Sequence, residues 1–433
     1  MKHIILLLLT VLNAFFAFGQ ITGTGVNKVY PNYKVYPDNT GVDYLIVFNG
    51  IDANTSISYS GTYTSINWYK FSNTTTPFLT GTANNYDVTD VTGYLIVIDN
   101  SVKISVWVID YQNYLLKFNN LAPENNPAEQ CAEVNLFLQA DIPPMWYQAF
   151  NKTTNLPSPV QIDRKFNLSY NTLEWAENDW QEKTETQEIL LPQEVITVAA
   201  PLKATEFTIS GDDFAADLNI NSLPTIISEL YTPVAVECHI LFTTDIREQL
   251  HEGDRPESAD VTEGSSPLEI RFEAKANEPI ATYFNWQIFR DGVQLFSRTE
   301  KDHYYKFMDA GIYKVVLTAR NQYCVNTDSM VVRITSSDMQ VPYAFTPNGD
   351  GINDEFRIAY KSLTQFKCWI FNRWGRQIYV WTDPQKGWDG TINGVPVKPG
   401  GYIYIIEATG ADINDITKKP IKYRKKGIVN LLR

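Results

Sequence analysis

The chain has 433 residues, with 36 Lys and Arg against 49 Asp and Glu, a formal charge of −13, and 13% aromatic residues. An acidic chain of this kind disfavours nucleic acid and anionic membrane surfaces as partners. The length suffices for several domains of roughly 100 residues, and four cysteines are too few for a disulfide-dense scaffold.

The first twenty residues have the pattern of a secretory signal peptide. Lys2 precedes an apolar run over residues 4–18, and Gly19 and Gln20 follow it. A basic start, a short hydrophobic stretch and small residues at its end are the parts of such a signal. We therefore expect residues 1–19 to be removed, with Gln20 as the new N-terminus. No later stretch is long and apolar enough to predict a transmembrane span.

The apolar runs of the remaining chain are typical of β-strands. They are rich in Val, Ile, Thr and Tyr, as in residues 44–48 and 94–98, and clusters of Asn, Gly, Asp and Thr bound them. This spacing predicts an all-β chain of tandem immunoglobulin-like β-sandwich domains. Residues 119–130 are polar and contain proline, and residues 249–266 are acidic, so both are predicted to be linkers.

Residues 20–118 have the spacing of strands and turns that is typical of an immunoglobulin-like β-sandwich. Trp68 lies where such domains bury a tryptophan, and Tyr94 follows a Thr-Gly turn, as at a tyrosine corner. We expect both residues to belong to the core.

Residues 131–248 are predicted to form a second β-rich sandwich, whose type the sequence does not define. The domain carries the aromatic residues Trp146, Tyr147, Phe150, Trp175 and Trp180. These either pack in the core and between domains or form a platform on which sugar rings stack.

The cysteines suggest one bridge within this second domain. Cys131 lies at its start and Cys238 in its last apolar strand. Because the ends of a sandwich domain often lie close together, we predict a disulfide between these two residues. Cys324 and Cys368 are then expected to be free.

Residues 262–337 resemble the PKD family of extracellular sandwiches. The resemblance rests on a tryptophan strand around Trp286, a turn at Asp291-Gly292, and the segment from Asp309 to Tyr313, where a tyrosine closes a corner. It implies a spacer or contact domain without catalytic residues.

The final module, residues 341–433, contains five ordered sequence blocks that end at the last residue. Its characteristic residues are Asn348, Gly349, Asp350, Gly351, Asn353, Asp354, Asn372, Arg373, Trp374, Gly375, Trp388, Asp389, Gly390, Gly427 and Arg433. In this pattern the module resembles the gliding-motility-associated C-terminal domain, the type B sorting domain of the type IX secretion system of Bacteroidetes. The resemblance implies export across the outer membrane, with the secretion machinery and an outer-membrane anchoring partner as binding partners, and a location at the cell surface or outside the cell.

The loop at the start of this module has two alternative interpretations. Asn348, Asp350, Asn353 and Asp354 bring oxygen-bearing side chains together around glycines. Such ligands suit calcium, but the same residues build turns by accepting hydrogen bonds from their own backbone. Calcium is the one cofactor that the sequence suggests.

Charge is unevenly distributed along the chain. The final module has 14 Lys and Arg against 8 Asp and Glu, a balance of +6, which leaves −19 for the rest. Its basic residues gather in a predicted hairpin over residues 418–426, and they either steer the module to an acidic docking partner or blunt an exposed strand edge.

We find no catalytic constellation in the sequence. Its four histidines, at positions 3, 239, 251 and 303, do not form a metal-ligand motif, and no nucleophile elbow is present. We therefore expect a non-enzymatic exported protein, namely an adhesin, a surface component or an accessory subunit that binds a cell-surface protein or a glycan. The alternative is a carbohydrate-binding or carbohydrate-active protein that uses the aromatic-rich second domain.

Overall fold

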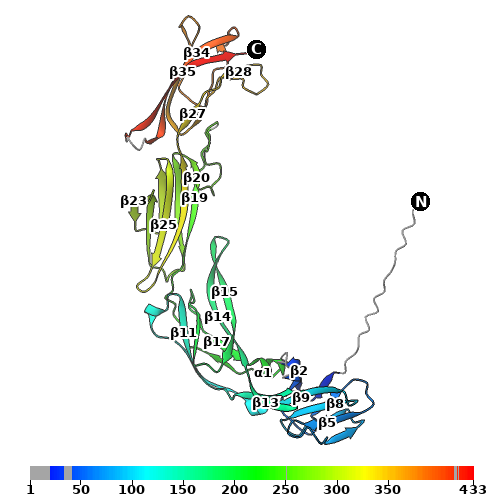
Figure 1. Cartoon of the computed structure of the whole chain (residues 1–433). Coiled ribbons are helices and arrows are strands. Elements are labelled where there is room, and N and C mark those ends of the chain that lie inside the picture. Colours follow the sequence, from blue (N-terminus) through cyan, green and yellow to red (C-terminus); the bar gives the residue numbers. More distant parts are fainter. Residues whose placement is uncertain (1–19, 34–40, 250, 414–416, 418) are drawn as a thin grey trace, which may run out of the picture.

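The computed structural model describes residues 20–33, 41–249, 251–413, 417 and 419–433, so the predicted signal peptide lies outside the described residues. The described residues form four β-rich units that follow one another along an elongated, bent molecule (Figure 1). The fold class is all-β, as predicted. In this part of the chain, no helix has the length and apolar character needed to cross a membrane.

The first unit is a sandwich with Trp68 and Tyr94 fully buried in its core, as predicted. One sheet has the order β1-β4-β7 and the facing sheet the order β2-β3-β9-β8-β5-β6. The strands are β1 (Ile21–Thr24), β2 (Asn27–Tyr33), β3 (Val42–Phe48), β4 (Ser56–Tyr59), β5 (Ile66–Lys70), β6 (Leu79–Gly81), β7 (Asn85–Asp87), β8 (Gly93–Ile98) and β9 (Val102–Asp110). A 3-10 turn, η1 (Tyr111–Tyr114), leads into the second unit.

The second unit packs the sheet β10-β11-β16 against the sheet β15-β14-β17-β18. The strands are β10 (Lys117–Pro123), β11 (Glu133–Asp141), β14 (Arg164–Ala176), β15 (Asp179–Leu191), β16 (Val195–Ala199), β17 (Thr208–Gly211) and β18 (Thr225–Ile227), with the turn η2 (Pro127–Glu129). The prediction of a linker over residues 119–130 was therefore wrong. Its first residues belong to β10, which lies at the edge of a sheet, where one face meets water, and the rest connect β10 to β11 through η2.

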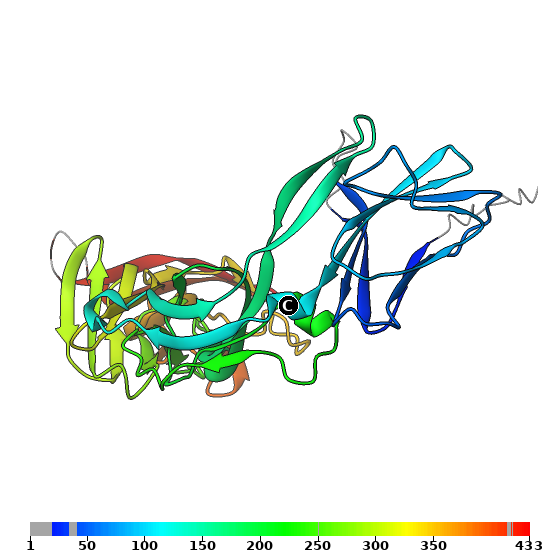
Figure 2. The same cartoon turned by 90° about the horizontal axis from the view of Figure 1, so that it is seen from below.

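A hairpin of the second unit completes the first unit. Strands β12 (Met145–Asn151) and β13 (Leu156–Ile162) pair with each other. Their buried side chains, together with Phe214 and Ala215 of α1 (Asp213–Asp217), form one core with the larger sheet of the first unit. Figure 2 shows the first unit set beside the other three, and this shared core holds it there.

The third unit begins earlier than predicted. Strand β19 (Cys238–Thr244), which we assigned to the second domain, pairs with β21 (Leu268–Ala276) of the third. Alternation alone cannot show which of two adjacent domains a strand completes. The sheets are β19-β21-β24 and β20-β26-β25-β22-β23, and the predicted corner forms, since the Tyr313 hydroxyl donates to the Asp309 carbonyl at 2.8 Å. The other strands are β20 (Glu263–Ser265), β22 (Tyr283–Arg290), β23 (Val293–Arg298), β24 (Asp302–Phe307), β25 (Gly311–Arg320) and β26 (Val325–Thr335).

The disulfide prediction was wrong in its pairing. Cys131 is bonded to Cys324, with Cα atoms 5.4 Å apart, so the bridge joins the second unit to the third. Cys238 instead points into the core of the third unit as a buried thiol. Cys324 lies in the turn between β25 and β26, which meets the start of β11. Cys368 is free and buried, as predicted.

The fourth unit is built on the sheet β28-β35-β34-β30-β31. Its strands are β27 (Asp338–Gln340), β28 (Ala344–Phe345), β29 (Ala359–Lys361), β30 (Leu363–Phe371), β31 (Gln377–Trp381), β32 (Thr391–Ile392), β33 (Val395–Pro396), β34 (Gly400–Ile413) and β35 (Pro420–Leu431). Strand β27 pairs with β29 and buries Met339, so the unit includes residues before 341.

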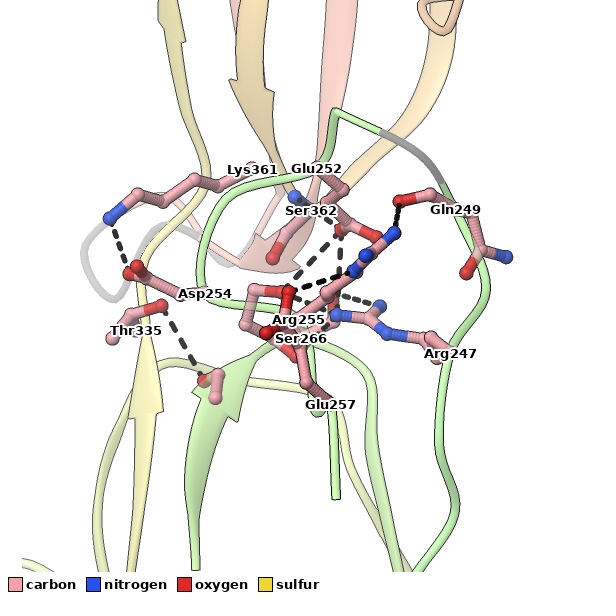
Figure 3. A network of polar contacts seen from close by, with 12 residues as sticks. Arg247, Gln249, Glu252, Asp254, Arg255, Glu257, Ser266, Thr335, Lys361 and Ser362 are labelled. Atoms are coloured by element: carbon pink, nitrogen blue, oxygen red, sulfur yellow. Dashed lines mark hydrogen bonds and ion pairs between the residues drawn. The ribbon is translucent and has the colours of Figure 1, made fainter. Parts of the chain in front are cut away.

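The acidic segment 249–266 was predicted to be a linker, but it bridges the third and fourth units (Figure 3). The buried carboxylate of Glu252 accepts from the Ser362 amide at 3.0 Å and lies 3.4 Å from Arg247. Arg247 also donates to the carbonyls of Ser265 and Ser266. Asp254 also pairs with Lys361 of β29, so this segment makes a hydrogen bond and an ion pair across the junction.

Candidate functional site

The loop between β28 and β29 is held by its own side chains. One carboxylate oxygen of Asp354 accepts from the amides of Asn348 and Gly349 at 3.0 and 2.7 Å, and the other accepts from the amide of Gly351 at 2.8 Å. The amides of Gly349 and Gly351, followed by that of Asn348, lower the pKa of the Asp354 carboxyl. Both glycines have positive φ, which an L-residue rarely adopts.

Other side-chain oxygens of this loop also accept hydrogen bonds from its backbone amides. The Asp350 carboxylate accepts from the Ile352 amide at 2.8 Å, and the side-chain oxygen of Asn348 accepts from the Asp350 amide at 3.2 Å. The backbone of Asn353 adopts the left-handed conformation, with positive φ. In the described part of the chain, no three His, Cys, Asp or Glu residues are arranged to hold a metal ion. Calcium binding stays a prediction, and these contacts favour the structural role of the loop.

The turn between β30 and β31 depends on Asn372. Its side-chain oxygen accepts from the amides of Trp374 and Arg376, both at 3.0 Å. Gly375 supplies the positive φ that closes the turn. The Arg373 guanidinium lies 4.3 Å above the Trp374 ring, which remains 75% exposed. The turn therefore presents a cation and an aromatic ring to solvent.

Trp388 is the central core residue of the unit. Its ring is fully buried, and the indole N–H donates to the Thr391 carbonyl at 2.8 Å. Asp389 accepts from the Thr391 amide at 2.9 Å. Gly390 has a φ of 75°, and a Cβ there would lie 2.7 Å from a methyl group of Leu431. The Trp-Asp-Gly block thus makes a tight turn directly against the last strand.

The end of the chain is tied into the same core. Gly427 lies opposite Tyr404, whose hydroxyl would be 2.5 Å from a Cβ at position 427. Arg433 donates to the carbonyls of Val397 at 2.9 Å and Gly390 at 3.2 Å. The sequence blocks that are far apart along the module therefore close a single small fold.

Comparison with protein families agrees with this arrangement. Residues 339–430 match the family of the CHU_C type IX secretion signal domain. The C-terminal unit is a type IX secretion signal domain. Such a domain directs export across the outer membrane to the cell surface or the extracellular space. Residues 123–227 match the fibronectin type III domain, which gives the second unit its type.

Solved structures of tandem sandwich proteins are similar to the chain at low identity. The FN1–FN3 domains of chicken CNTN1 are 10% identical, with 72% of this chain and 98% of that chain covered and a TM-score of 0.22. Immunoglobulin domains 1–5 of Sidekick-1 are 10% identical, with coverages of 93% and 99% and a TM-score of 0.23. No curated protein matches the chain.

The basic residues of the secretion signal domain divide between its two faces. Lys422, Arg424 and Lys426 point outward from β35, whereas Lys425 donates to the Met339 carbonyl on the inner side. Lys419 is exposed before β35, and Lys418 lies outside the described residues. Most residues of the predicted basic hairpin therefore belong to one long strand, β35. Every second side chain, at 422, 424 and 426, points outward, where a partner can reach its charge.

The aromatic residues of the second domain do not form one platform. Tyr147 and Phe150 are buried at the junction with the first unit, where Phe150 stacks on Phe71. The ring of Trp175 stacks on His239 of the third unit at 4.8 Å, and Trp180 packs beside it. Trp146 alone among the five is exposed. Most of this aromatic surface therefore joins domains.

Sequence reasoning missed a buried ionic cluster at the junction of the first two units. Arg164 and Asp212 are both buried, with an N–O distance of 2.5 Å, and the Tyr111 hydroxyl donates to Asp212 at 2.8 Å. Burial and the neighbouring charge of Asp212 raise the pKa of Asp213 to about 6. Asp212 and Asp213 are adjacent acidic residues after Gly211, and nothing in the neighbouring sequence marks their partners on other elements.

Proposed function

We propose that the protein is a non-enzymatic adhesin or accessory surface component, in which the secretion signal domain directs export and attachment and the other three units form an arm. The observation that carries this proposal is that every junction between the four described units is packed or bonded. Domains joined by exposed, flexible linkers move independently. Here a shared core, a disulfide and the Asp254–Lys361 ion pair join successive units.

The arm places the first unit at the end of the molecule opposite to the secretion signal domain (Figure 1). The hairpin of the second unit covers the larger sheet of the first, which leaves the sheet β1-β4-β7 outward. Hydroxyl groups line this sheet. The hydroxyl oxygens of Thr22 and Ser58 are 2.9 Å apart, and those of Thr24 and Ser56 are 2.7 Å apart. Such a surface suits a ligand that forms hydrogen bonds, in the form of a cell-surface protein or a glycan.

The alternative of a carbohydrate-active second domain has less support. Sugar-stacking residues need exposed ring faces, and four of the five candidate rings lie at domain junctions. The Asp213 carboxyl, whose pKa is raised to about 6, lies within the junction as well.

The test uses the mature protein, residues 20–433, immobilised to capture ligands from native cell surfaces. We expect capture to be lost when Thr22→Lys and Asn85→Lys change the outward sheet of the first unit. The matched variant carrying Gln187→Lys and Thr184→Lys, on the β15 hairpin, should capture normally.

A hydrolysis assay on glycans, peptides and esters completes the test. We expect no turnover. Turnover that a single Asp→Asn or Glu→Gln change abolishes would show an enzyme and overturn the proposal.

A further inference from the structure

The main sheet of the secretion signal domain has one side without a covering layer among the described residues. Phe366, Cys368, Ile370, Ile406 and Val429 point to the core and are buried. Their neighbours along each strand point the other way, since side chains alternate. We call this side the outer face, formed by Lys367, Trp369, Phe371, Val380, Ile403, Ile405, Glu407, Lys422, Arg424, Lys426 and Ile428.

Strand register aligns the apolar side chains of the outer face into rows. Val380 lies opposite Trp369, which lies opposite Ile405. In the neighbouring row, Phe371 lies opposite Ile403, which lies opposite Ile428.

Solvent reaches much of these rows. Ile428 is 60% exposed, Val380 42% and Ile403 38%. The solvated side of an antiparallel sheet is normally polar, and a contiguous apolar patch there marks an interaction surface.

Positive charge borders these rows. Lys367, Lys422, Arg424 and Lys426 are exposed, and Glu407 is the acidic residue of the outer face, 3.4 Å from Arg424. A shallow groove of about 440 Å³ runs between Lys367, Lys422 and Arg424 on the same side. An apolar centre with a charged rim is the usual anatomy of a protein interface.

We propose that the outer face is the docking surface of the secretion signal domain, and that its occupant is an envelope protein presenting an acidic surface around an aliphatic centre. This inference rests on the sorting role of the domain. Charge complementarity selects the acidic partner: the basic rim steers it, and the apolar rows exclude water once it is bound. A protein fits better than a bilayer, because the apolar rows cross the middle of a flat sheet and do not project from a loop tip.

The experiment follows export of the full-length protein in a host with the secretion system. One variant reverses rim charges, Arg424→Glu with Lys426→Glu, and a second removes apolar surface, Ile403→Thr with Ile428→Thr. Lys386→Glu with Lys398→Glu is the matched charge control, and Val395→Thr the matched apolar control; all three residues are exposed and lie off the outer face. We expect the exported fraction to fall on the order of tenfold for the first two variants, with unfolding temperatures unchanged, and normal export of the controls.

A photoreactive amino acid at position 405, compared with position 395, identifies the occupant during export. We expect a cross-link from position 405 alone, to a peptide of an envelope protein that carries Asp or Glu beside aliphatic residues. A lipid adduct, an adduct to a second copy of this chain, or a peptide without acidic residues would overturn the proposal. So would normal export of both outer-face variants while deletion of residues 337–433 blocks it. If that deletion also leaves export intact, the sorting role itself fails.

Discussion

Cys131 and Cys324 are bonded across the junction between the second and third units, although 193 positions separate them in the sequence. In the part of the chain that the structure describes, the backbone passes between these units once, before β19. The side-chain amide of Asn277, which is buried, ties the same junction by donating to the carbonyls of Leu202 at 3.1 Å and Ala235 at 2.8 Å. Two separate connections oppose rotation at this point, which is what an arm of fixed shape requires.

The first prediction concerns the state of the four cysteines. Peptide mapping of the exported protein without reduction should recover Cys131 linked to Cys324. Burial raises the pKa of Cys238 to about 11 and also raises that of Cys368, so both thiols should resist alkylation until the protein unfolds. Cys324→Ser should expose Cys131 to alkylation, whereas Cys238→Ser should leave the bridge intact. A bridge between Cys131 and Cys238 would contradict the structure.

The second prediction concerns the bridge between the third and fourth units. Glu252→Ala should destabilise the junction by about 2–3 kcal/mol, because the Ser362 amide and Arg247 lose a charged partner. Hydrogen exchange at Ser362 should rise. Glu257→Ala is the matched control, since its side chain is 74% exposed against 5% for Glu252, and it should change stability by less than about 0.5 kcal/mol. Equal effects of the two changes would contradict the role of Glu252.

The sequence was informative where structure depends on local patterns. Alternating strands predicted the all-β class, and glycines next to Asn and Asp predicted the turns of the secretion signal domain. Trp68 and Tyr94 were correctly expected in the core. Each of these follows from a few neighbouring residues, so a single sequence suffices.

Contacts between domains were not predictable in the same way. Strand β19 has the same alternation whether it closes the second unit or opens the third, and Cys238 was assigned a partner on the first assumption. The hairpin β12-β13 likewise gives no local sign that its apolar side completes the first unit. The same limit applies to the outer face, whose apolar rows appear only when register places separate strands side by side.

The third prediction concerns pH. Burial, and then the charge of Asp212, raise the pKa of Asp213 to about 6 from an ordinary value of 3.8. The folded protein therefore holds this proton more tightly than the unfolded chain, and stability is lost as pH rises through about 4 to 6. Asp213→Asn should raise the unfolding temperature at pH well above 6 and have little effect at pH below 4. The exposed control Asp87→Asn should show no such difference, and a constant effect at all pH values would contradict the assignment.

The fourth prediction compares two glycines of the secretion signal domain. Gly390 and Gly394 have similar φ values, 75° and 80°, but a Cβ at 390 would lie 2.7 Å from the buried Leu431, whereas nothing lies within 4 Å at 394. Gly394→Ala should cost only the backbone penalty of about 1 kcal/mol. Gly390→Ala should cost roughly 1–3 kcal/mol more, because the core must shift. Denaturant unfolding measures both, and equal losses would show that the contact with Leu431 does not matter.

The last prediction concerns which residues are needed to carry a fused protein across the outer membrane. The Tyr423 hydroxyl contacts the Ser337 hydroxyl at 2.8 Å and carbonyl at 2.7 Å, and Met339 is buried in the core of the secretion signal domain. A fluorescent protein fused to residues 336–433 should therefore reach the surface or the medium more efficiently than one fused to residues 341–433, which lacks β27. Chains truncated after Gln340 should accumulate in the periplasm. Fractionation and surface proteolysis measure the exported share, with thermal unfolding of each fusion as the control for folding. Equal export of both fusions would show that β27 is dispensable, and normal export of the truncated chain would show that the signal lies elsewhere.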